Sequence, residues 1–116
     1  MRNFKELKVW QKARVLVKDV HLLSAKFPNE EKFGMTQQLR NAALSISNNI
    51  AEGCGRRTDG DFKRFIDIAC GSATETENMI YLSLDLNFIT KGDHGMMVER
   101  IEEIQKMLIG LYNSLN

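Results

Sequence analysis

The sequence contains few prolines, which interrupt helices, and few cysteines, which can form disulfides. The 116 residues include one proline and two cysteines, which excludes a proline-rich tail and a small secreted fold held by disulfides. The longest apolar run, residues 107–112, is interrupted by Gly110 and is far too short to span a bilayer. The first residues contain no apolar stretch typical of a secretory signal. We therefore expect a cytoplasmic protein without a membrane partner.

Patterns that mark metal sites and catalytic sites are also missing. Cys54 and Cys70 are not at metal-ligand spacing, and the two histidines, at positions 21 and 94, are far apart. No Glu-x-x-His pair is present, which a di-iron bundle needs on two helices. The segment GCGRRTDG, residues 53–60, lacks the GK[ST] of a Walker loop. We expect no metal, no cofactor, no small-molecule substrate and no enzymatic activity.

Helical periodicity is the strongest signal that the sequence does contain. Apolar residues recur every three or four positions in four segments, which run from Val9 to Phe27, from Met35 to Ile50, from Phe62 to Leu84 and from Met97 to Leu115. Four such helices with short connections predict an all-α fold, an up-down-up-down antiparallel four-helix bundle. The bundle would form a single domain over residues 1–116.

The breaks between these segments carry recognisable capping residues. Pro28 ends the first helix, because the residue before a proline avoids the α region, and Asn29 can cap the second. The glycines around Cys54 end the second helix. The third helix would begin at Thr58 or Asp59, and residues 87–95 would form the last break, with Thr90 or Asp93 as the cap.

The short second turn predicts which residues of the second and third helices face each other. Facing positions should have numbers that sum to about 115, so Arg40 would lie level with Glu75 and form a salt bridge. Ala42 and Ala43 would lie level with Gly71, which would let the helices approach closely. The same register places the two cysteines roughly 12 Å apart along the axis, too far for a disulfide.

A stripe of small or neutral polar residues lies beside the apolar face of the second helix. It consists of Gln38, Ser45, Asn49 and Glu52. The stripe is either a solvated flank or an interface, whose partner could be another helix or another subunit. The sequence leaves these alternatives open.

Positive charge is expected to gather at one end of the bundle, where the first helix begins and the second turn lies. The basic residues are Arg2, Lys5, Lys8, Lys12, Arg56, Arg57, Lys63 and Arg64, and the acidic ones are Glu6, Glu52, Asp59 and Asp61. These side chains could bind phosphate or could be ordinary solvated charges. At a net charge of +1, a monomer would bind nucleic acid weakly, and a ring of subunits would multiply the patch.

Several short motifs point to a known family. They are Phe27-Pro28, Phe33-Gly34, Gln38-Leu39-Arg40, Asn49-Ile50-Ala51-Glu52-Gly53 and Ala69-Cys70-Gly71-Ser72. The pattern resembles the 23S ribosomal RNA intervening-sequence proteins, four-helix bundles sometimes filed as ribosomal proteins. The resemblance implies a bacterial, cytosolic, non-enzymatic bundle. The accessory protein of diversity-generating retroelements, a more distant relative, forms a basic pentameric ring that binds nucleic acid, so the resemblance also implies a homo-oligomer.

Two functions are consistent with these observations. In the first, the protein is an oligomeric scaffold whose basic end contacts the phosphates of RNA or DNA without base specificity. In the second, it is a protein–protein adaptor that docks a partner on the polar and apolar face of the second helix. Phosphate contacts predict binding that weakens steeply with salt, whereas an apolar docking surface predicts little change.

Overall fold

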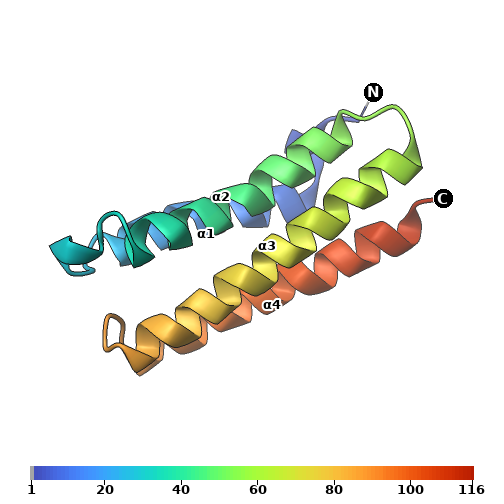
Figure 1. Ribbon diagram of the computed structural model, residues 1–116. Helices are drawn as coiled ribbons and strands as arrows, with labels where there is room; N and C mark the ends of the chain where they lie inside the picture. The colour runs from blue at the N-terminus through green and yellow to red at the C-terminus, as the bar shows by residue number, and fades with distance from the viewer. Residues whose placement is uncertain (1) are drawn as a thin grey trace.

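The computed structural model describes residues 2–116, and four long helices account for most of this range (Figure 1). They are α1 (Lys8–Ser24), α2 (Met35–Cys54), α3 (Asp59–Asp85) and α4 (Lys91–Ser114), with the short 3-10 helices η1 (Phe4–Glu6) and η2 (Asn29–Glu31). Each long helix packs against the next in the chain, and α1 also contacts α4. The predicted all-α antiparallel bundle is confirmed.

The core consists of the positions that the periodicity predicts. In α1, residues Val9, Ala13, Leu16 and Val20 are each at most 4% exposed, and they recur every three or four positions along one face. The last predicted heptad position, Leu115, lies just after α4 and is only half-buried, because the bundle ends there. The apolar stripe therefore predicts which face of each helix is buried, while burial decreases toward the open end.

Two of the predicted helix starts are confirmed. The Thr58 hydroxyl accepts a hydrogen bond from the Asp61 amide at 3.1 Å, and Thr90 accepts one from the Asp93 amide at 3.0 Å. However, α4 begins immediately after Thr90, so the predicted break over residues 87–95 is too long. The N-cap bond and the packing of the rest of α4 outweigh the cost of the two glycines in its first turns.

The predicted start of the second helix is wrong. Asn29 begins the separate 3-10 helix η2, and α2 starts only at Met35, after Gly34. Gly34 has no side chain with which to cap the helix. The Glu31 carboxylate instead accepts a hydrogen bond from the Met35 amide at 3.3 Å. A negative group at this position also interacts favourably with the helix dipole.

The backbone of α2 lies close to α3 at Gly53, whereas at Gly71, where we expected a close approach, α3 faces open space. A Cβ atom at position 53 would lie 2.7 Å from the Phe65 Cβ and 2.9 Å from the Phe62 Cδ1. Gly71 is exposed, and a Cβ there would meet nothing within 4 Å. The predicted register is close, since Ser45 faces Ser72, but a register sets the level of a residue and not the side of the helix on which it lies.

We predict opposite effects for alanine at these two glycines. Gly53→Ala should reduce the free energy of unfolding by about 1–2 kcal/mol, because overpacking against Phe65 exceeds the gain in helix propensity. Gly71→Ala should increase it by about 0.5–1 kcal/mol, because it gains the same propensity without a clash. Urea unfolding followed by circular dichroism measures both changes, and stabilisation by Gly53→Ala would contradict the close contact.

Candidate nucleic-acid interface

The start of the described chain, the α2–α3 turn and the C-terminus lie at the same end of the bundle (Figure 1). This arrangement brings together the basic residues singled out in the sequence, and we call them the basic end: Arg2, Lys5, Lys8, Lys12, Arg56, Arg57, Lys63 and Arg64. The molecule measures 43 × 24 × 20 Å, so this end is well separated from the one that carries η2 and the α3–α4 turn.

Several of these basic side chains form ion pairs. The pairs are Arg2–Asp59, Arg56–Glu52 at 3.0 Å, Arg64–Asp61 at 3.5 Å and Lys12–Glu103 at 3.3 Å. In residues 2–116, four members of the basic end have no acidic partner within ion-pair distance, namely Lys5, Lys8, Arg57 and Lys63. The basic end is therefore partly neutralised, and four of its eight cations have no carboxylate partner in the described chain.

Aromatic rings lie beneath four cations of the basic end, three of which are also ion-paired. The Arg56 and Arg64 guanidinium groups lie 4.6 and 5.6 Å from the centre of the Phe65 ring. Arg2 lies 4.8 Å from the Phe62 ring, and Lys63 lies 5.0 Å from the Tyr112 ring. Such contacts hold a cation at the surface without neutralising it.

The polar stripe of α2 is only partly an interface. Ser45 Oγ lies 2.8 Å from Ser72 Oγ of α3, and Asn49 Nδ2 donates to the Ser45 carbonyl at 2.7 Å and to Ser45 Oγ at 3.0 Å. Ser45 therefore belongs to the α2–α3 contact within the chain, and Asn49 bonds back to Ser45 within α2. Gln38 and Glu52 are exposed, so they form the solvated part of the stripe.

Arg40 does not form the salt bridge that we expected with Glu75. Its Nε donates to Ser24 Oγ at 2.8 Å and its Nη2 donates to the His21 carbonyl at 3.2 Å, while Glu75 is exposed. Arg40 therefore reaches the C-terminal end of α1, where it donates to a carbonyl and a hydroxyl oxygen. A cation at this end of a helix also interacts favourably with the helix dipole. It joins α1 to α2 at the end opposite the basic end.

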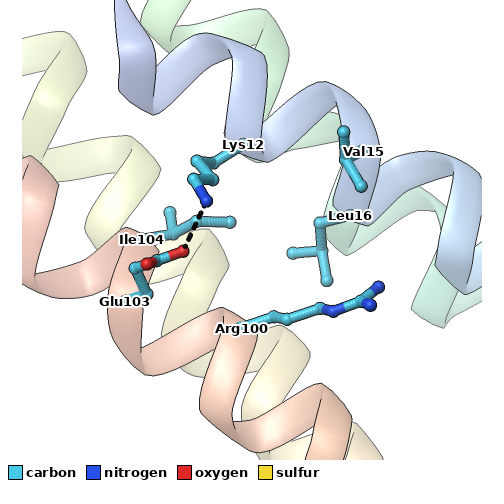
Figure 2. A pocket seen from close by; sticks show the side chains of 6 residues that line it. All are labelled: Lys12, Val15, Leu16, Arg100, Glu103 and Ile104. Carbon is cyan, nitrogen blue, oxygen red and sulfur yellow. Dashed lines mark ion pairs between the residues drawn. The ribbon is translucent and has the colours of Figure 1, made fainter.

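A hollow of about 210 Å³ lies between α1 and α4 (Figure 2). Its apolar wall comes from Val15, Leu16 and Ile104, and Lys12 and Glu103 pair across it. Arg100, which also lines it, is paired with Asp19. The charged side chains around this hollow thus form ion pairs that join α1 to α4. Sequence reasoning did not predict these pairs.

A second hollow, of about 280 Å³, lies between α1 and α2. We call it the Trp10 hollow, and its lining residues are Phe4, Trp10, Arg14, Val17, Ser47, Asn48 and Ala51. Sequence reasoning did not find it, because its α2 residues, Ser47, Asn48 and Ala51, lie outside both the apolar stripe and the polar stripe of that helix.

Neither cysteine is bonded to the other, as the register predicted. Cys54 is buried and Cys70 is half-buried, and both are free thiols. Burial raises the pKa of the Cys54 thiol against the opposing effect of Arg2, and burial together with the Asp67 carboxylate raises the pKa of Cys70. Both groups are therefore protonated near neutral pH and are weak nucleophiles.

The described residues also contain no obvious metal site or membrane span. No group of three or more His, Cys, Asp or Glu side chains in residues 2–116 is arranged to hold a metal ion. Within the same range, every helix is too short or too polar to cross a bilayer.

Comparison with known proteins identifies the family. The family model "23S rRNA-intervening sequence protein" matches residues 5–110. The chain belongs to this family. A search among curated proteins finds no match.

One crystal structure shares this fold closely. It is described as a protein with unknown function from the S23 ribosomal protein family of Bacteroides thetaiotaomicron. The TM-score is 0.84 at 28% sequence identity, and the match covers 90% of this chain and 97% of the other. The bundle is therefore a shared structure of the family and not a feature of this sequence alone.

We predict that Arg40, and not Glu75, contributes to stability. Arg40→Met keeps most of the apolar stem and removes the bonds to α1, so it should reduce the free energy of unfolding by about 1.5 kcal/mol. Glu75→Gln should change it by less than about 0.5 kcal/mol, as for an ordinary surface substitution. Chemical unfolding of both variants checks this, and an equal loss in Glu75→Gln would favour the original pairing.

Proposed function

We propose that this protein is a non-catalytic, oligomeric bundle that binds RNA or DNA through its basic end. The observation that supports this best is that the start of the described chain, which carries Lys5 and Lys8, lies at the same end as the α2–α3 turn, which carries Arg56 and Arg57 (Figure 1). Cations from separate segments at one end of an elongated molecule form a compact target for a phosphate backbone.

The ion pairs at this end do not prevent phosphate binding. Arg56 pairs with Glu52, and both side chains are about half exposed. An exposed ion pair contributes only about 0–1 kcal/mol, so a phosphate can replace the carboxylate at little cost. The ring of Phe65 holds the Arg56 and Arg64 guanidinium groups in place during such an exchange.

Oligomer formation is part of the proposal, because a single chain has little net charge. At +1, one subunit attracts nucleic acid weakly, whereas several basic ends on one assembly bind with combined strength. The resemblance to the pentameric retroelement accessory protein suggests five subunits.

A role as a protein adaptor is the second candidate, and exposed apolar residues on the other flank of α2 favour it. Phe33 is 83% exposed and Leu44 is 44% exposed, and both line a hollow of about 320 Å³ at the α1–α2 surface. The polar stripe of α2 would contribute little to docking, since Ser45 and Asn49 are already bonded within the chain.

We predict that reversing the charges at Arg56 and Arg57 weakens binding. The double variant Arg56→Glu/Arg57→Glu should bind single-stranded RNA more weakly. The slope of the logarithm of the binding constant against the logarithm of the salt concentration should become shallower by about two, one for each lost phosphate contact. The matched control is Lys26→Glu/Lys91→Glu, which changes two exposed cations at the opposite end. Fluorescence anisotropy at a series of salt concentrations measures the RNA affinity of both variants. Full affinity in the Arg56/Arg57 variant would rule out the proposed phosphate binding at the basic end.

We also predict that the protein is an oligomer in solution. Light scattering after size exclusion at tens of micromolar should give a multiple of the 13.3 kDa chain mass, with five copies expected from the resemblance. A mass of one chain across that range would remove the oligomeric part of the proposal. Binding that is insensitive to salt would instead favour the adaptor.

A further inference from the structure

The Trp10 hollow combines an aromatic ring, free polar groups and nearby positive charge. Its volume of about 280 Å³ lies just below the ~300–1,000 Å³ of pockets for drug-sized ligands. A hollow of this size suits one flat ring system. It lies on the outer surface of the α1–α2 pair, where η1 packs against both helices.

Trp10 is held in position within this hollow. The Phe4 ring meets it edge-on, with 4.9 Å between ring centres and an angle of 77° between the planes. The Arg14 guanidinium lies 5.5 Å from the Trp10 ring centre, and in residues 2–116 Arg14 forms no ion pair. A fixed, half-buried indole beside an unpaired guanidinium is the arrangement on which nucleic-acid bases stack.

The α2 side of the hollow supplies hydrogen-bonding groups that nothing else in the described chain uses. The Asn48 side chain is exposed, and none of its atoms forms a hydrogen bond to another described residue. Ser47 Oγ donates to the Leu44 carbonyl at 2.9 Å, so its lone pairs remain available. An amide carries both donors and an acceptor, which matches the edge of a base.

Positive charge flanks the hollow on the side of the basic end. Lys5 follows Phe4 in η1, and Lys8 lies two residues before Trp10 at the start of α1. Both are exposed and lack an acidic partner among residues 2–116. Glu6 is the one carboxylate in this segment, so cations predominate. A strand that follows the basic end would pass the hollow.

We propose that the Trp10 hollow binds one base of a single-stranded nucleic acid. The base stacks on Trp10 beside Arg14, its edge contacts Asn48, and Lys5 and Lys8 contact the flanking phosphates. This inference rests on the proposed nucleic-acid binding and specifies its substrate. The bases of a duplex are already stacked and paired and cannot enter the hollow, so the protein discriminates in favour of single strands. The α1–α4 hollow lacks these features, because it has no aromatic ring and its charges are paired.

Trp10 is the only tryptophan in the chain, so its fluorescence reports on this site alone. We expect a short oligoadenylate RNA to quench Trp10 emission in the unmodified protein. A duplex of the same length, and an abasic oligomer with the same phosphates, should leave the emission nearly unchanged. Emission that is unchanged at saturating single-stranded RNA, or equal quenching by the abasic oligomer, would overturn the proposal.

Substitutions then separate stacking from phosphate contact. Trp10→Leu should weaken oligoadenylate binding roughly 5- to 150-fold, the range for loss of one stacked base, and Trp10→Phe should recover part of the loss. The salt dependence should stay the same, because no phosphate contact is removed. Tyr81→Leu, which changes an exposed aromatic side chain of α3, is the control and should bind normally. Circular dichroism verifies that each variant is folded.

Asn48→Ala provides a test that does not disturb the packing of Trp10, because this side chain is exposed. It should weaken binding of oligoadenylate and leave binding of the abasic oligomer unchanged. Equal affinities of the variant and the unmodified protein for oligoadenylate would argue against the base contact.

Failure of this inference differs from failure of the proposed function. RNA binding that requires Arg56 and Arg57 but leaves Trp10 emission unchanged would overturn the base site alone. Quenching of Trp10 that is indifferent to Arg56 and Arg57 would support the base site and remove these two arginines from the proposed phosphate contacts. Absence of any RNA binding would overturn both.

Discussion

The contact between Gly53 of α2 and two phenylalanines of α3 is the constraint on which the rest of the structure depends. Without a side chain at Gly53, Phe62 and Phe65 can pack directly against the α2 backbone. The same two rings lie beneath the arginines of the basic end, with Arg2 over Phe62 and Arg56 over Phe65. The close packing of the two helices and the placement of the cations therefore have one origin.

The two flanks of α2 explain why this helix tolerates so many poor helix formers. Ser45 bonds to Ser72 of α3, and Asn49 bonds back to Ser45, while Ser47 and Asn48 line the hollow toward α1. Intrinsic propensity costs each of these residues a few tenths of a kcal/mol relative to alanine. Burial of the apolar stripe between them, including Ile46 at 0% exposed, outweighs this cost.

Much of the fold could be predicted from the sequence, and less of the site. The stripe from Val9 to Val20 and the caps at Thr58 and Thr90 follow from local rules that do not depend on the partner helix. Arg40 could not be assigned, because a long side chain at the correct level can turn to either neighbouring helix. The Trp10 hollow depends on η1, a short 3-10 helix without a repeating pattern, so only the folded chain reveals it.

The Asp59 carboxylate links the two ends of the chain. Its Oδ1 pairs with Arg2, and its Oδ2 accepts a hydrogen bond from the Asn116 amide at 3.3 Å. A peptide fused at either terminus would thus lie beside the basic end, whereas an insertion at Asn87, a residue in the left-handed conformation at φ 62°, would lie at the far end. The termini are also close enough to be joined by a short linker, so the bundle is a natural candidate for circular permutation with a new opening at the α3–α4 turn.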